Sequence, residues 1–266
     1  MVRRLLAAVG IALVATVALL MILEERLLFP AHAVGPAGPL PQGAIEIEAA
    51  SADRTRLVGV HVPPSSPTDL LVLVFPGNGW NSFDAATVVH SLYPDAHVVA
   101  FHYRGYRSSE GSPSAKALLD DAPLVHDAAV AASGARRVLL VGMSIGTGVA
   151  THLATERDVA GAILVTPFDS LRKVAAEAIP VLPIEGLFRN EIASAESLKG
   201  RSTPTAIVAA ERDEIISTAR TDGLRSVAAN LLFDRTIEGA GHNDIYGRKE
   251  FVTAMSDART AILSAQ

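Results

Sequence analysis

The chain has 266 residues, no cysteine, 19% charged residues and a formal net charge of −5 at pH 7. This length suits one domain with a large buried core. The lack of cysteine excludes disulfides, a cysteine nucleophile and thiolate metal ligands. Nucleic-acid binding needs a clustered basic face, whereas the basic residues of this acidic chain are dispersed, which argues against that class.

The N-terminus explains the high mean hydropathy of +0.31. Residues 5–23 form an uncharged run that is apolar except for one glycine and one threonine. A helix of this length spans about 28 Å, close to the ~30 Å hydrocarbon core of a bilayer. Because Arg3 and Arg4 precede the run, the positive-inside bias predicts a single-pass anchor. Residues 1–4 would then lie in the cytoplasm and the domain 27–266 outside it.

Two other interpretations of this segment remain. A cleaved signal peptide would have a shorter apolar stretch and a small-residue cleavage site. The triplet Ala31-His32-Ala33 fits such a site, but it lies beyond the charges that follow the run. A buried core helix of this length would show a polar stripe, and none is visible. We therefore predict the anchor, with secretion after signal cleavage as the alternative.

Apolar runs bounded by turn residues predict strands, and longer mixed stretches between them predict helices. Strands that alternate with helices imply a mostly parallel sheet covered on both faces. The predicted strands are 45–48, 57–62, 70–75, 98–103, 138–141, 162–165, 205–209 and 231–237, and the predicted helices are 83–92, 118–132, 148–155, 218–229 and 244–263.

The region 167–199 breaks this alternation. It is long, contains Pro180 and Pro183, and ends in a helix-like stretch. Ligand sites of α/β sheets lie at the carboxyl ends of the strands. We therefore predict that this region is an insertion that forms a cap or lid over that edge.

The sharpest chemical signal is Gly142-Met143-Ser144-Ile145-Gly146, which follows a predicted strand and precedes a predicted helix. The flanking glycines permit a tight turn that side chains would block. Such a turn lifts the hydroxyl of Ser144 onto the edge of the sheet, which is typical of a nucleophile. The alternative is a serine that only caps the following helix.

A serine nucleophile needs a base, and an acid must fix the tautomer of that base. His242 is the candidate base, since it stands in the glycine-rich loop 239–243 after the last predicted strand. Asp213 follows strand 205–209 and is the candidate acid, with Asp169 as the second choice. A packed or surface role is predicted for His32, His61, His90, His97, His102, His126 and His152.

Acyl transfer also needs two donors for the oxyanion. The backbone amide of Ile145, directly after the candidate nucleophile, is one candidate. The backbone amide of Asn78 is the other, because Gly77 and Gly79 allow a substrate to approach it closely. The chain has neither a P-loop lysine motif nor a GxGxxG fingerprint, so nucleotide binding is not expected.

Several blocks together resemble the α/β-hydrolase superfamily, and most of all its membrane-anchored serine hydrolases with one N-terminal span. They are Arg26-Leu-Leu-Phe-Pro30, Pro76-Gly-Asn-Gly, Tyr103-Arg-Gly-Tyr-Arg-Ser-Ser-Glu-Gly-Ser112, Gly142-Met-Ser-Ile-Gly-Thr-Gly148, Asp213 and Gly241-His242. The resemblance covers residues 27–266. It implies the α/β-hydrolase fold, with a mostly parallel central sheet, helices on both faces and a short cap insertion.

The resemblance also implies roles for five residues. Ser144 would be the nucleophile, Asp213 the acid and His242 the base, with the amides of Asn78 and Ile145 as the oxyanion hole. The chain departs from the family in two places. It has Pro76 where a histidine is frequent, and His102 where aspartate or asparagine is common, and no catalytic role is predicted for His102.

The sequence thus predicts a serine hydrolase that cleaves acyl esters or thioesters through an acyl-enzyme. Its substrate would be a small-molecule or lipid acyl compound, and no metal or organic cofactor is implied. A peptidase or amidase would use the same three residues. A hydrolase-fold protein tethered to the membrane that binds a ligand without turnover is the alternative from another class. The sequence does not indicate an oligomeric state.

Overall fold

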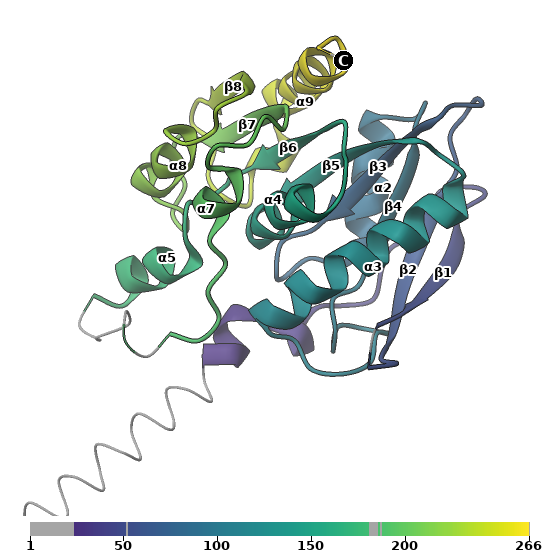
Figure 1. The fold of residues 1–266 in the computed structure, drawn as a ribbon, viewed down its shortest axis with the longest axis horizontal. Helices are drawn as coiled ribbons and strands as arrows, with labels where there is room; N and C mark the ends of the chain where they lie inside the picture. The colour runs from purple at the N-terminus through teal and green to yellow at the C-terminus, as the bar shows by residue number, and fades with distance from the viewer. Residues whose placement is uncertain (1–23, 52, 181–185, 187, 266) are drawn as a thin grey trace, which may run out of the picture.

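A computed structural model describes residues 24–51, 53–180, 186 and 188–265 (Figure 1). The predicted membrane anchor, residues 5–23, lies outside the described residues. Among the helices within the described ranges, none is long and apolar enough to cross a membrane.

One eight-stranded sheet forms the centre of the described structure. The order of its strands is β1-β2-β4-β3-β5-β6-β7-β8, and only β2 runs opposite to its neighbours. The predicted mostly parallel α/β-hydrolase sheet is therefore confirmed. The strands are β1 (Ile45–Ala50), β2 (Arg56–Val62), β3 (Leu70–Phe75), β4 (His97–Phe101), β5 (Arg137–Met143), β6 (Gly161–Val165), β7 (Thr205–Ala210) and β8 (Leu231–Ile237).

Helices cover both faces of the sheet (Figure 1). One face packs against α2 (Ser82–Leu92) and α9 (Lys249–Leu263), and the other against α3 (Ala115–Ser133) and α4 (Ile145–Glu156). The helices α7 (Ser194–Leu198) and α8 (Thr218–Arg225) belong to the same core as α3 and α4, and α7 contacts α4. The remaining elements are η1 (Ala31–Ala33), α5 (Leu171–Ala178) and η2 (Ile245–Gly247).

The continuous apolar sequence of the central strands follows from this layering. Side chains alternate between the two faces of a strand, so a strand covered on both faces needs no polar position. In β3, Leu71 and Leu73 belong to the core under α3 and α4, whereas Val72 and Val74 belong to the core under α2 and α9. All six residues of β3 are buried.

The ends of several helices differ from the prediction. α4 begins at Ile145 rather than at residue 148, and α8 ends at Arg225 rather than at residue 229. The predicted helix 244–263 is divided into η2 and α9, because Arg248 between them has an extended backbone with ψ 141°. Pro123 lies deeper in its helix than predicted, since α3 already begins after Ser114, whose hydroxyl accepts a hydrogen bond from the amide of Ala117.

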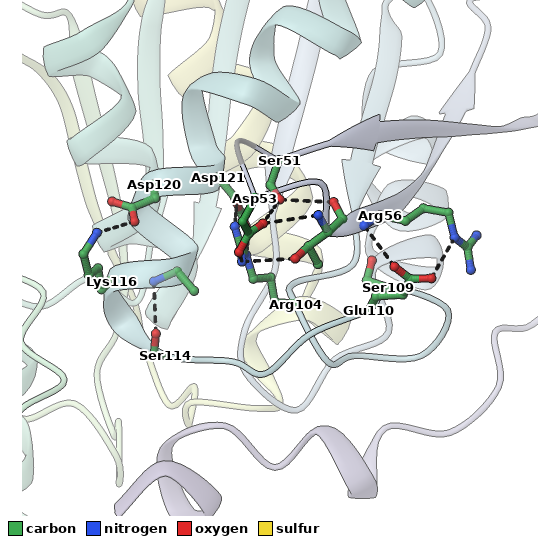
Figure 2. A network of polar contacts seen from close by, with 12 residues as sticks. Ser51, Asp53, Arg56, Arg104, Ser109, Glu110, Ser114, Lys116, Asp120 and Asp121 are labelled. Carbon is green, nitrogen blue, oxygen red and sulfur yellow. Dashed lines mark hydrogen bonds and ion pairs between the residues drawn. The ribbon is translucent and has the colours of Figure 1, made fainter.

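An almost buried ion-pair network fixes the loop that follows β4 (Figure 2). Arg104 donates two hydrogen bonds to Asp121 of α3, at 2.6 and 2.7 Å, and one to Asp53 at 2.7 Å. The side chains of Arg104 and Asp121 are only 14% and 9% exposed. The network joins the turn between β1 and β2, the loop after β4 and α3. It thereby holds in place the segment that contains Tyr103.

Replacing Asp121 by Ala should lower the free energy of unfolding by about 2 kcal/mol, because the largely buried Arg104 loses two of its three hydrogen bonds to carboxylates and keeps only the one to the exposed Asp53. The neighbouring Asp120 is the matched control, since it pairs with Lys116 on the surface of the same helix, where both side chains are largely exposed. Asp120→Ala should cost less than about 0.5 kcal/mol. Urea unfolding of the two variants measures this difference, and equal losses would contradict it.

Candidate active site

The turn between β5 and α4 holds Ser144 in a backbone conformation that is rare for a residue with a side chain. Its φ is 52° and its ψ is −121°, and its amide donates to the carbonyl oxygen of Val165 at 2.9 Å. A Cβ atom on Gly142 would lie 2.6 Å from the carbonyl oxygen of Gly146, and one on Gly146 would lie 2.0 Å from that of Phe75. Both glycines are therefore required by close approach of the backbone.

Gly146→Ala should lower the free energy of unfolding by about 3 kcal/mol or more, because β3 and α4 would have to separate. Gly247 provides the control, since a Cβ atom there meets nothing within 4 Å. Thermal unfolding of both variants tests this contrast. A Gly146→Ala protein with the melting temperature of the Gly247→Ala protein would show that the contact can relax.

Three of the sequence-predicted residues lie in series, each within hydrogen-bonding distance of the next. The Nε2 atom of His242 lies 3.0 Å from the hydroxyl oxygen of Ser144. The Nδ1 atom of the same ring lies 2.9 and 2.8 Å from the two carboxylate oxygens of Asp213. The side chains of His242 and Asp213 are 5% and 6% exposed, so both are largely shielded from solvent.

Local turns orient both partners of Ser144. The carboxylate of Asp213 accepts hydrogen bonds from the amides of Ile215 and Ile216, at 2.9 and 2.7 Å. The backbone amide of His242 donates to Glu214 at 3.0 Å. The carboxylate of Asp213 is thus held facing Nδ1 of His242, and Nε2 of the same ring faces Ser144. With the Nδ1 hydrogen directed at Asp213, Nε2 would be able to act as a base toward Ser144.

Asp169, the second candidate for the acid, lies elsewhere. Its side chain is 4% exposed and pairs with Lys173 at 2.8 Å and with Arg220 at 3.1 Å. These contacts join α5 to α8. The structure thus brings Asp213, and not Asp169, to His242.

The predicted oxyanion loop, residues 76–80, follows β3 and lies beside Ser144. A Cβ atom on Gly77 would be 3.6 Å from the Cβ atom of Ser144, and the two candidate donors, Asn78 and Ile145, border the same cavity as Ser144. The hydroxyl of Tyr103 donates to the carbonyl oxygen of Pro76 at 2.8 Å. The sequence pattern did not predict this hydrogen bond, although Tyr103 stands in one of the blocks on which the resemblance rests.

An apolar cavity of about 660 Å³ opens above Ser144. Four residues of α5, within the predicted cap region, form one side of it, and Trp80 and Tyr246 contact each other on another, with ring centroids 4.8 Å apart. Leu27 and Ile215 line it while remaining 67% and 50% exposed. Apart from Asn78, Asn243, Ser144 and His242, the side chains that border it are apolar or aromatic, which suits an acyl chain.

His102 has no place in this site. It is buried and stacks on Phe83, with ring centroids 4.4 Å apart. Burial, and to a smaller extent the charge of Arg107, lowers the pKa of His102 to about 4. Among the described residues, no cluster of three or more histidine and carboxylate side chains could hold a metal ion.

The lowered pKa of His102 predicts a loss of stability in acid. The unfolded chain binds the proton near the ordinary pKa of 6.5 and the folded chain only near 4. Stability should therefore fall as the pH drops from about 6.5 to 4, by up to about 3 kcal/mol from this residue. Urea unfolding across this range should give a shallower pH slope for His102→Asn than for the wild type. Parallel slopes would refute the assignment.

Comparison with known proteins identifies the family of the chain. The model of the alpha/beta hydrolase family matches residues 71–198, which include Asn78 and Ser144. An uncharacterized protein of Mycobacterium tuberculosis is 31% identical over 249 residues, which are 88% of this chain and 86% of that protein. The chain belongs to the α/β-hydrolase family.

Other relatives carry more specific names. The lysophosphatidylserine lipase ABHD12 of Macaca fascicularis is 34% identical over 152 residues, which are 50% of this chain but only 38% of that protein. A Pyrococcus furiosus esterase has the same fold, with a TM-score of 0.68 at 17% identity over 85% of this chain and 94% of its own. A bacterial membrane phospholipase A matches 98% of this chain and 99% of its own, with a TM-score of 0.63 at 18% identity.

Proposed function

We propose that this protein is a serine hydrolase that cleaves acyl ester or thioester bonds through an acyl-enzyme. Ser144 is the nucleophile, His242 the base and Asp213 the acid that orients the base. The observation that carries the proposal is the 3.0 Å distance between the hydroxyl oxygen of Ser144 and Nε2 of His242, beneath an apolar cavity.

The reaction takes place in two halves. The hydroxyl oxygen of Ser144 attacks the acyl carbonyl carbon while His242 takes the proton of that hydroxyl. The resulting oxyanion accepts hydrogen bonds from the backbone amides of Asn78 and Ile145. The tetrahedral intermediate expels the alcohol or thiol, which takes the proton from His242. Water then attacks the acyl-enzyme with His242 again as the base, and the free acid leaves. Asp213 stabilises the positive imidazolium in both halves.

The cavity supports an acyl chain as the part of the substrate that is bound. Its lining is mostly apolar, and its volume of about 660 Å³ lies within the range of sites for small ligands. Several relatives are named as esterases or lipases, which supports a lipid ester in particular. Together with the anchor predicted for residues 5–23, this leads us to propose a membrane-tethered enzyme whose domain lies outside the cytoplasm.

A fluorophosphonate probe tests the proposal, because it reacts covalently with activated serines. The full chain in detergent should be labelled, and Ser144→Ala and His242→Ala should abolish the labelling. Both variants should also lower kcat for a p-nitrophenyl ester by at least about 10³-fold.

Ser133→Ala is the matched control, since the hydroxyl of Ser133 donates to the carbonyl oxygen of Ala129 within α3, and Ser133 does not line the cavity. This variant should keep full labelling and turnover. A folded wild-type protein that neither reacts with the probe nor cleaves esters would contradict the proposal and favour ligand binding without turnover.

A further inference from the structure

The N-terminal strap, residues 24–34, is fixed to the hydrolase domain. Phe29 and Val34 are 3% and 4% exposed and belong to the core of one sheet face. One carboxylate oxygen of Glu24 accepts three hydrogen bonds. They come from the amides of Arg189 and Asn190, at 3.1 Å each, and from the side-chain amide of Asn190 at 3.0 Å.

The partner that Glu24 contacts is itself held firmly. Asn190 is 4% exposed, and its side-chain oxygen accepts a hydrogen bond from the amide of Ala115, the first residue of α3, at 3.0 Å. Glu24 therefore attaches the strap to a buried junction between the predicted cap region and α3. Figure 1 shows the first turn of the strap, in purple, at the end of the molecule that also carries α5.

The strap also reaches the machinery of the proposed reaction. Leu27 and Leu28 line the cavity above Ser144. The side-chain amide of Asn78 donates to the backbone carbonyl oxygen of Leu28 at 2.7 Å. The same Asn78 is the proposed source of one oxyanion amide. The strap therefore fixes the side chain of Asn78, and Tyr103 fixes Pro76 at the start of the predicted oxyanion loop.

We propose that the strap is a working part of the acyl site, in which Glu24 is a positioning residue for the oxyanion loop and Leu27 a contact for the distal part of a long acyl chain. This rests on the proposed function. Glu24 fixes the strap, the Leu28 carbonyl then fixes Asn78, and the two leucines complete the cavity wall. Since the strap follows directly on the predicted anchor, the preferred substrate is a long-chain acyl ester presented at a lipid surface.

Positioning by Glu24 is tested with a charge-matched pair. Glu24→Ala in the full chain, in detergent micelles, should lower kcat about tenfold for both p-nitrophenyl acetate and p-nitrophenyl dodecanoate, since the oxyanion amide serves every ester. The KM for the acetate should change less than about twofold. Glu25→Ala removes the same charge from the exposed next residue and should leave both rates unchanged. Glu24→Gln keeps an acceptor oxygen and should restore most of the lost rate.

The acyl contact is tested at the exposed Leu27, where a substitution does not disturb the core. Leu27→Ser should raise the KM for p-nitrophenyl dodecanoate about fivefold and the KM for p-nitrophenyl acetate by much less, because the short acyl group has no distal part to contact Leu27. Val252→Ser is the control, because Val252 is 51% exposed on α9 and does not line the cavity.

The outcomes separate this inference from the proposed function. If Glu24→Ala behaves like Glu25→Ala, and Leu27→Ser like Val252→Ser, while Ser144→Ala is inactive, the strap inference is overturned and the serine hydrolase stands. Turnover that survives in Ser144→Ala overturns both. If Glu24→Ala does not fold, the comparison of Glu24→Gln and Leu27→Ser with their controls decides the inference.

Discussion

Ser144 has a φ of 52° in a turn next to the point where β3 and α4 approach each other too closely for a side chain at Gly146. This close approach brings the start of α4, directly after the serine, against the end of β3. It also places the loop after β3 beside the serine, with Gly77 within van der Waals reach of its Cβ position. The proposed nucleophile and the predicted oxyanion loop thus meet at one closely packed point.

The rest of the site is arranged around that point by three independent supports. Turns after β7 and β8 direct Asp213 and His242 toward the serine. Tyr103, in the loop that the Arg104 network fixes, holds Pro76 at one end of the oxyanion loop. The N-terminal strap holds Asn78 through Leu28. Because the supports come from distant parts of the sequence, the site is complete only in the folded domain.

Sequence patterns were sufficient for the parts of this architecture that depend on local chemistry. The strands 70–75 and 231–237 have the bounds that their apolar and alternating residues predict. Glycines around a serine after a buried strand predicted the turn at Ser144. Ser144, Asp213 and His242 were selected because each follows a predicted strand. The structure brings these three side chains together.

Features that depend on tertiary contacts could not be predicted. α4 begins three residues before the predicted start at residue 148, because packing against β3 allows helix at Gly146 despite the low helix propensity of glycine. The break at Arg248 and the ion pair of Asp169 with Arg220, 51 positions away, have no signature in the local sequence. The bond from Asn78 to Leu28 joins residues 50 positions apart, so only the folded chain reveals that the strap reaches the oxyanion loop.

The proposed function depends on covalent chemistry at Ser144. Rapid-quench mass spectrometry of the full chain during turnover of p-nitrophenyl dodecanoate measures this chemistry. The peptide containing Ser144 should gain the mass of one dodecanoyl group and lose it as the substrate is consumed. Ester turnover without acylation of that peptide at any quench time would contradict the proposed mechanism.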